Sequence, residues 1–389
     1  MRALPYTTPE DTQRSARVMV VTMLALLGLG VVMAYSATMV EQMRTSGPGT
    51  LLHPLASHLM KVGLALGGFL LALRVTPGRL FAAARPAWAL GVLLLALIPF
   101  LGTESHNARR WFGVGGASFQ PSEFARVATM VMVGAWMAAA RDRVSELRTG
   151  VLIPFALAAV PAVLVFIEPD FGSAVYLLFM GVLVMWVGGA RSRHLLSVFL
   201  PTLLIGCILG WTLFTHFRTR IAGFVSTEPD WQVSQGLTSL GSGGLLGAGL
   251  GNGMGKWGFL PEARNDFLFA VIGEELGLLG TLGVVGLYAV FLWHGTRVLL
   301  ALKSRFSLVV GAGLLMQVLV QAVLNIAVVT AVAPNKGLPL PFVSAGGTSL
   351  FVLCTSTGLL LGLARRPEED PVLEARWATS LTHRGVPGS

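Results

Sequence analysis

The sequence predicts an all-α, polytopic membrane protein with about ten transmembrane helices. Two observations carry this prediction. Of the 389 residues, 54% are hydrophobic and only 12% are charged, whereas a soluble domain carries about 25% charged residues. Apolar runs long enough to cross a bilayer also recur along the whole chain, separated by short polar loops.

The apolar runs define the expected spans, which lie at 18–35, 55–73, 87–101, 124–140, 151–167, 171–187, 195–214, 267–293, 308–332 and 350–364. The first run, at about eighteen residues, is longer than the core of a signal peptide, so we interpret it as an uncleaved helix. We expect one integral membrane domain over 1–366. The polar, proline-containing segment 367–389 is expected to form a disordered cytoplasmic tail.

Basic residues mark one side of the membrane. Of the 28 lysines and arginines, 18 lie in the termini and in alternate short loops. The positive-inside rule therefore predicts that both termini are cytoplasmic. The long loops 102–121, 215–265 and 333–348 then face outward, and the largest of them joins helices 7 and 8. Long loops are where function concentrates, so we expect the site on this extracytoplasmic side.

Composition excludes several other classes of protein. The net charge of +9 is concentrated in short loops, so it signals topology and not nucleic-acid binding. Cys207 and Cys354 both lie in apolar segments, which predicts neither a disulfide framework nor a metal site. The glycine-rich run 247–253 lacks the GK[ST] ending of a phosphate-binding loop.

Asp266 lies where the longest outer loop becomes a helix. One interpretation is structural: the carboxylate complements the helix dipole, with Asn265 as a cap. The other is a general base at the membrane surface, where partial desolvation strengthens a carboxylate as a base. The residues alone leave both open. Glu274 and Glu275 lie deeper in the same helix, and for them we favour hydrogen bonding or pairing with a basic residue.

Further polar residues lie in the other outer segments. Arg109 and Arg110 precede Glu123 and Arg126, which are three residues apart at a helix start and can form an ion pair. We favour an anion-binding edge here, because outward-facing arginines are few and suit phosphate. Two acids bracket Pro169 in a tight turn, and we favour capping by the second acid over metal binding.

The proline- and glycine-rich loop at 333–348 is predicted to line a cavity, because irregular backbone at membrane depth is tolerated only there. Its Lys336 can meet a phosphate or extend to the membrane surface.

Together these segments resemble the FtsW/RodA (SEDS) family of membrane glycosyltransferases that build the bacterial cell wall. The similar strings, in order, are RRWFGVGG, QPSEFAR, EPDFGS, GLGNGMGKWGFLPEARNDFLFAVIGEELG and NKGLPLPFVSAGGTS. The resemblance covers nearly the whole chain. Arg126, Asn265 and Ala345 depart from the lysine, threonine and tyrosine common in the family. The Asn-Lys-Gly at 335–337 favours the FtsW-like division branch over the RodA-like elongation branch.

The resemblance implies peptidoglycan polymerisation from lipid II, an undecaprenyl-pyrophosphate-linked substrate, on the outer face of the cytoplasmic (inner) membrane. It places the family's essential aspartate on Asp266 and the glutamate of its QPSE motif on Glu123. It also implies a class B penicillin-binding protein as partner. Supporting positions are Glu262, Glu274, Ser344, Gly346 and Gly347.

An α-linked pyrophosphate donor and a β-1,4 product require one inversion, hence one general base and no covalent intermediate. We expect Asp266 to be that base. The leaving pyrophosphate needs charge stabilisation, for which the outward-facing candidates are Arg109, Arg110, Glu123 with Arg126, Lys256, Arg264 and Lys336. A divalent cation is left open, with no clear site. The alternatives are a lipid II flippase or a scaffold without chemistry.

Overall fold

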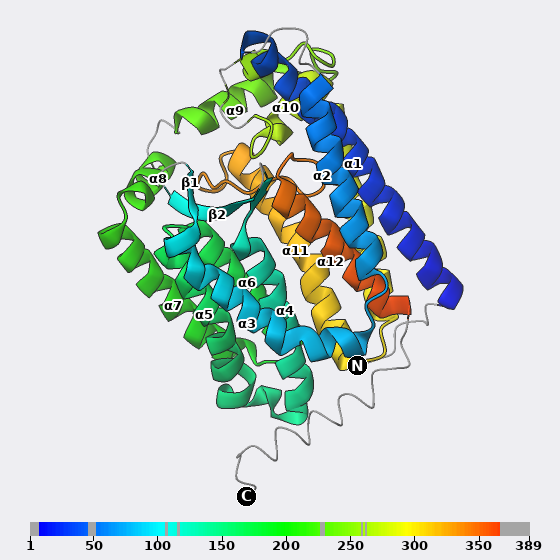
Figure 1. Ribbon diagram of the computed structural model, residues 1–389, viewed down its shortest axis with the longest axis vertical. Coiled ribbons are helices and arrows are strands. Elements are labelled where there is room, and N and C mark those ends of the chain that lie inside the picture. Colours follow the sequence, from blue (N-terminus) through cyan, green and yellow to red (C-terminus); the bar gives the residue numbers. More distant parts are fainter. Residues whose placement is uncertain are drawn as a thin grey trace, which may run out of the picture.

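The computed structural model describes residues 8–45, 52–105, 108–114, 117–225, 230–257, 260 and 263–365. Its helices are α1 (Pro9–Thr45), α2 (Leu52–Ala72), α3 (Pro77–Leu101), α4 (Pro121–Ala140), α5 (Ile153–Ile167), α6 (Phe171–Val187), α7 (Ser192–Leu213), α8 (Thr215–Val225), α9 (Trp231–Ser242), α10 (Leu268–Leu300), α11 (Arg305–Val329) and α12 (Gly347–Arg365). The strands are β1 (Thr103–Ser105), β2 (Ala108–Val114) and β3 (Ala117–Phe119). Figure 1 shows the long helices as one bundle, with α9 and the strands toward one end.

The expected membrane spans are confirmed. Within the described ranges, 9 helices are long and apolar enough to cross a membrane, and the apolar helix α6 is shorter. These ten helices occupy the ten positions expected from the sequence, with ends that differ by several residues. The protein is therefore a polytopic helical membrane protein, as predicted.

Local sequence fixes several of the helix starts. Asp170 caps α6 by accepting a hydrogen bond from the backbone N–H of Ser173 at 3.0 Å. This confirms the capping role predicted for the second acid of that turn. Ser304 caps α11 in the same way through Ser307 N, also at 3.0 Å. A proline opens α4, where its missing N–H is not needed.

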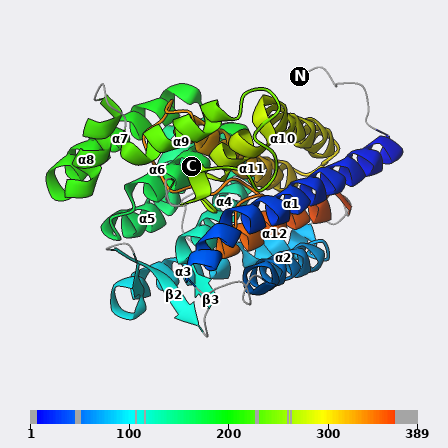
Figure 2. The ribbon, with the colours of Figure 1, turned by 90° about the horizontal axis from the view of Figure 1, so that it is seen from above.

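The centre of the bundle is formed by α4, α11 and α12. Buried residues make up 72%, 61% and 78% of their most apolar stretches, against 11% for α7. The closest packing pairs α12 with α2, α1 with α10, and α3 with α4. Seen from above, α7 and α8 lie at the edge of the molecule, away from α1, α2 and α12 (Figure 2). A site that needs several rigid walls can form only near the central helices.

The end of the molecule predicted to be extracytoplasmic carries more regular structure than the sequence indicated. The loop at 102–121 forms a three-stranded antiparallel sheet in the order β1-β2-β3. The loop at 215–265 contains α8, α9 and a short helical turn at Gly255–Trp257. The sequence predicted a long loop at 215–265 and did not reveal these helices, because α8 and α9 are too short and too polar to stand out as spans.

Helix α10 is broken at Gly277, whose backbone φ of 68° lies in the left-handed region that favours glycine. The segment Gly243–Gly255, which we name the glycine loop, packs against this break. A side chain at Gly277 would collide with the backbone of Gly247 and Leu245. The glycine therefore permits both the bend and the close approach of the loop.

Candidate active site

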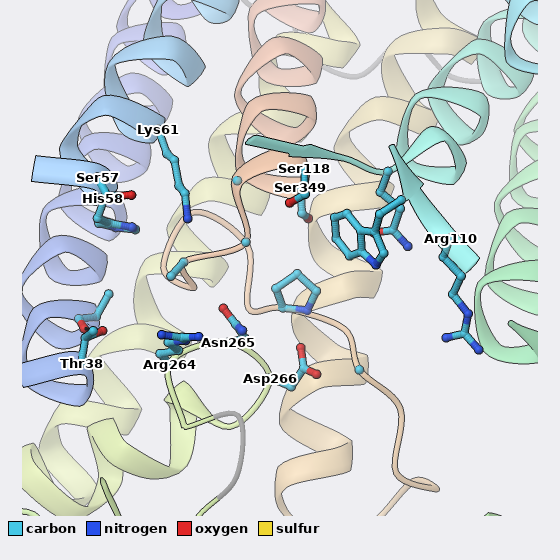
Figure 3. Close-up of a pocket in the computed structure, with 18 of the residues that line it drawn as sticks. Thr38, Ser57, His58, Lys61, Arg110, Ser118, Arg264, Asn265, Asp266 and Ser349 are labelled. Atoms are coloured by element: carbon cyan, nitrogen blue, oxygen red, sulfur yellow. Dashed lines mark hydrogen bonds between the residues drawn. The ribbon is translucent and has the colours of Figure 1, made fainter. Parts of the chain in front are cut away.

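A cavity of about 810 Å³ lies in the half of the molecule that the sequence predicts to be extracytoplasmic, between α1, α2, the strands and the segments that flank α10 and α12. Figure 3 shows Lys61 reaching toward it from α2 and Arg110 from β2 on the opposite side, with Asn265 and Asp266 between them. Its walls thus come from parts of the chain that lie far apart in the sequence.

Asp266 lines this cavity and is held there by its backbone. Its carbonyl oxygen accepts a hydrogen bond of 2.7 Å from the side-chain amide of Asn325 on α11. The same amide nitrogen donates to Leu338 O at 2.6 Å. One buried asparagine therefore ties the Asp266 segment to the loop at 333–346, and so fixes two walls of the cavity relative to each other.

Further bonds fasten the same two segments. The Ser344 hydroxyl donates to Asn265 O at 2.5 Å and accepts from Leu340 N at 2.9 Å. The backbone N–H of Ala345 donates to Arg264 O at 3.3 Å. Ser344, predicted as a supporting residue, thus acts on the neighbours of Asp266 and does not itself line the cavity.

Gly337 lies directly beside the Asp266 carboxylate. A Cβ atom added at Gly337 would lie 2.7 Å from Asp266 Oδ2. That is closer than ordinary van der Waals contact, so any larger residue would displace the carboxylate. Gly346 and Gly347 also line the cavity, and a Cβ at Gly347 would lie 3.4 Å from the Lys61 side chain. The glycines of this loop keep the cavity open around the carboxylate.

The charged side chains lining the cavity are predominantly basic. The cavity cations, as we name them, are Lys61, Arg110, Arg220 and Arg264, and the carboxylates are Asp170 and Asp266. The charges of Lys61 and Arg264 repel each other across the cavity. Concentrated positive charge in a partly enclosed site attracts an anion such as a pyrophosphate.

Arg110 faces the cavity but also contacts the turn between α5 and α6. Its Nε donates to Glu168 O at 3.1 Å and its Nη2 to Pro169 O at 2.6 Å. Its Nη1 lies 3.8 Å from Asp170 Oδ2. Burial alone would raise the pKa of Asp170, yet Arg110 and Lys336 hold it below its usual range. Arg110 therefore anchors the β-sheet to the α5–α6 turn while facing the cavity.

Several residues predicted to bind the substrate do not line the cavity. Arg109 is exposed beside it and donates through Nη1 to Pro99 O at 3.3 Å. Glu123 and Arg126 form a buried ion pair at the start of α4. The Arg126 guanidinium lies over the ring of Tyr176, with Cζ 4.6 Å from the ring centroid. The predicted pairing is confirmed, and the pair is enclosed by protein.

Lys336 was also expected to meet the substrate and instead points into this buried cluster. Its Nζ lies 5.2 Å from the centroid of the Tyr176 ring. Burial lowers the pKa of Lys336 to about 8, although the nearby charge of Asp170 acts in the opposite direction. A Cβ at Gly172 would lie 2.5 Å from the Lys336 side chain, so this glycine makes room for the lysine. Lys336 therefore positions the loop that carries Gly337.

Lys256 requires a correction. It was predicted as a pyrophosphate ligand, but its side chain is 0% exposed and its Nζ lies 2.7 Å from Glu275 Oε1. It also donates to the Ser36 hydroxyl on α1 at 3.0 Å. The side chain has no access to the cavity. The interpretation of Glu275 as the partner of a basic residue is confirmed.

Glu274 is likewise internal. Its Oε1 accepts hydrogen bonds from the backbone N–H groups of Met254 and Gly255 at 2.6 and 3.0 Å. This confirms hydrogen bonding as its role. Glu262 lies outside the described residues.

Some cavity residues were not predicted from the sequence to face a ligand, notably His58, Lys61, Asp170 and Arg220. Two of them carried a detectable signal. Lys61 is a cation inside an otherwise apolar span, and such residues are usually functional. Arg220 is a basic residue in a loop predicted to face outward, where the positive-inside rule disfavours it. In the described ranges, no cluster of three or more His, Cys, Asp or Glu side chains could hold a metal ion.

Comparison with known proteins identifies the family. A family model for the FtsW, RodA and SpoVE proteins, described as "Cell cycle protein", matches residues 17–369. The chain belongs to this family. A probable peptidoglycan glycosyltransferase FtsW of Idiomarina loihiensis is 33% identical over 347 residues, covering 87% of this chain and 84% of that protein. Stage V sporulation protein E of Bacillus subtilis is 32% identical over 280 residues, covering 70% and 76%.

Solved structures support the same family fold. One, described as a peptidoglycan synthase complex that coordinates polymerization and crosslinking, matches with a TM-score of 0.74 and 27% identity over 90% of this chain and 98% of its own. RodA of Thermus thermophilus matches with a TM-score of 0.64 and 27% identity, covering 90% and 97%. The relatives named FtsW favour the FtsW-like branch for this chain.

Proposed function

We propose that this protein is a peptidoglycan glycosyltransferase that polymerises lipid II on the outer face of the cytoplasmic membrane, with Asp266 as the general base. The observation that carries the proposal is the Asp266 carboxylate in a cavity lined by Lys61, Arg110, Arg220 and Arg264. The printed names of the FtsW relatives support the activity.

The proposed reaction is a single displacement at the anomeric carbon. Asp266 accepts the proton of the acceptor sugar hydroxyl, and the hydroxyl oxygen forms the new glycosidic bond as the bond to pyrophosphate breaks. The lipid-linked pyrophosphate departs with the bonding electrons, and nearby cations stabilise its negative charge. One displacement inverts an α-linked donor to a β-linked product, so no covalent enzyme intermediate is needed.

The burial of several cations supports a smaller set of proposed pyrophosphate ligands. Arg264 is exposed, next but one to Asp266, and lies near Lys61 across the cavity. Arg220 reaches the cavity from α8. Arg126 and Lys256 are better assigned to internal ion pairs, and Lys336 is better assigned to the buried Tyr176 ring, over which its amine lies. We therefore propose Arg264, Lys61 and Arg220 as the main pyrophosphate ligands, with Arg110 contributing from the opposite wall.

The decisive experiment is strand synthesis from lipid II by purified protein in detergent. Asp266→Asn should reduce polymerisation by about 10²–10⁴-fold, the range for loss of a general base. Asp142→Asn makes the same chemical change on an exposed residue in the basic loop after α4 and should act like wild type. Undiminished synthesis by Asp266→Asn would refute the mechanism. No synthesis by wild type would favour the flippase or scaffold, since detergent abolishes sidedness.

We also propose a membrane topology and a partner protein, a class B penicillin-binding protein. Both termini should be cytoplasmic and Asp266 should face outward. Without Cys207 and Cys354, a cysteine at Ser234 should react with an impermeant thiol reagent in intact spheroplasts, and one at Ser192 only after lysis. The reverse pattern would place the cavity on the wrong side for flipped lipid II. Adding a class B penicillin-binding protein to the polymerisation assay tests the proposed partnership, and no change in rate would count against it.

A further inference from the structure

The glycine loop, Gly243–Gly255, presents an unusual surface for a segment outside the membrane spans. It contains no charged residue. Four of its large apolar side chains are exposed: Leu245 at 69%, Leu246 at 77%, Leu250 at 57% and Met254 at 64%. Such a surface in water is costly, whereas the same surface in lipid is favourable.

Backbone groups of this loop form hydrogen bonds with α10 on both sides of its break at Gly277. In an unbroken helix the carbonyls of Glu274 and Glu275 would accept from residues four positions later. Here Ala248 N donates to Glu274 O at 2.9 Å. Gly249 N donates to Glu275 O at 3.0 Å. The loop therefore supplies donors that the broken helix lacks.

Helix α10 also donates hydrogen bonds to the loop. Leu278 N donates to Gly244 O at 2.9 Å, and Leu279 N donates to Leu245 O at 3.3 Å. These bonds hold the loop at the same level as the first turn of α10 after the break. On that turn Leu278 and Leu279 are themselves 48% and 62% exposed, which continues the apolar surface of the loop onto the helix.

The two buried glutamates complete the bonding of the loop. Gly251 N donates to Glu275 Oε2 at 3.1 Å, and Met254 N to Glu274 Oε1 at 2.6 Å. Lys256 offsets the charge of Glu275 at 2.7 Å. Irregular backbone is tolerated at membrane depth only where protein satisfies its polar groups. The hydrogen bonds to α10 and to the two glutamates satisfy many of the backbone groups of this loop.

The length of α10 places the loop relative to the bilayer. The whole helix has 33 residues, about 50 Å, which exceeds the hydrocarbon thickness of about 30 Å. The part after Gly277 spans about 34 Å and is long enough to cross alone. The break, with the glycine loop around it, then lies at the boundary of the leaflet farther from the basic loops.

We propose that the glycine loop is inserted into this outer leaflet, with Leu245, Leu246, Leu250 and Met254 in contact with acyl chains. The loop is thereby an interfacial membrane anchor that holds the nearby Asp266 segment at a fixed depth. Lipid is the occupant because the apolar surface of the loop is continuous with that of a membrane-spanning helix. This proposal is independent of the chemistry assigned to Asp266.

The test is fluorescence quenching of a polarity-sensitive label in nanodiscs. Single cysteines replace Leu246 or Leu250 in a background with Cys207→Ser and Cys354→Ala. Leu282→Cys, on the exposed face of α10, is the lipid reference. Thr238→Cys, exposed on α9, is the water reference. Each labelled protein must keep the unfolding temperature of the cysteine-free protein, and the two loop sites give independent readouts.

Labels at Leu246→Cys and Leu250→Cys should be quenched by doxyl groups on the acyl chains and protected from aqueous iodide, as at Leu282→Cys. Doxyl near the headgroup end should quench them more strongly than doxyl near the chain end. Quenching by iodide, as at Thr238→Cys, would overturn the proposal. Protection from both quenchers would also overturn it, because protein and not lipid would then cover the loop.

Discussion

Two sets of cations in the half of the molecule predicted to be extracytoplasmic differ in their surroundings. Lys61, Arg220 and Arg264 face the cavity. The charged groups of Arg126, Lys256 and Lys336 are enclosed by protein: the first two pair with carboxylates, and the amine of Lys336 lies over the ring of Tyr176. The comparison teaches that a cation in this half of the molecule can reach a ligand only when its side chain opens onto the cavity. The buried cations stabilise the walls of the cavity, and the cavity cations face its interior.

The largest effect should come from breaking a buried pair. Lys256→Met leaves the Glu275 carboxylate buried without a counter-charge, which typically costs about 3–5 kcal/mol of stability. Thermal unfolding of the purified protein measures this loss. Lys256→Met combined with Glu275→Gln should recover most of it, because the amide oxygen can still accept from Gly251 N. Equal destabilisation by the single and double variants would show that Lys256 acts through packing alone.

Removing a cavity cation should lower activity and leave stability unchanged. Arg264→Ala or Lys61→Ala should lower kcat/KM for polymerisation by about 10- to 150-fold, corresponding to about 1.5–3 kcal/mol for a lost charged hydrogen bond. The unfolding temperature should stay near that of wild type. Lys303→Ala, exposed in a basic loop, is the matched control. A large drop in unfolding temperature with unchanged kinetics would reverse the division between the two sets.

A third change tests whether the loop at 333–346 positions the Asp266 carboxylate. Gly337→Ala places a methyl group 2.7 Å from Asp266 Oδ2 and should shift the carboxylate. Misplacement of a reacting group by about 1 Å can cost up to about 10²-fold in rate. Gly286→Ala on α10, where an added Cβ meets nothing within 4 Å, should leave the rate unchanged. Equal rates for both variants would remove the positioning role of this loop.

The smallest effect is a pH dependence at Glu168, which lies in the α5–α6 turn bonded to Arg110. Burial, and then the charge of Asp170, raises the pKa of Glu168 from 4.5 to about 8. The folded protein therefore binds this proton more tightly than the unfolded chain, and its contribution to stability is lost as pH rises from about 4.5 through 8.

Glu168→Gln should remove that component of the pH dependence while keeping a side chain of similar shape. Unfolding temperatures of wild type and Glu168→Gln should diverge progressively across this window, with the variant more stable at pH 8. Parallel curves for the two proteins would contradict the assignment.

Much of the fold was predictable from the sequence because lipid imposes a simple length and composition rule. The ten spans and the capping of α6 by Asp170 follow from local signals. The small sheet and α9 do not, since they are short and depend on distant helices: the sheet packs on α3, α4 and α12, and α9 packs on α10 and α11. The break at Gly277 was also missed, because glycine is common in membrane helices and its φ is set by the loop that packs on it.

The site was predictable only in part, because the burial of a side chain depends on contacts that are distant in the sequence. Arg264 and Asp266 could be selected because the motif that contains them lies at a membrane boundary. Lys256 lies in the same stretch, yet the fold turns it toward Glu275. Burial depends on which helix lies opposite, and that partner, α1, is more than 200 residues away. Local spacing carries no information about such a contact.

The cavity is assembled from both ends of the chain, from Ala34 on α1 to Ser349 on α12. A ribosome delivers these parts in order, N-terminus first. A nascent chain stalled after α10 would already contain Asp266 and Lys61 but would lack Asn325, Gly337 and Ser344. The carboxylate would then have no fixed position. The cavity is therefore complete only after α12 has been synthesised and inserted into the bilayer. A truncated protein that lacks α11 and α12 should be inactive in the membrane.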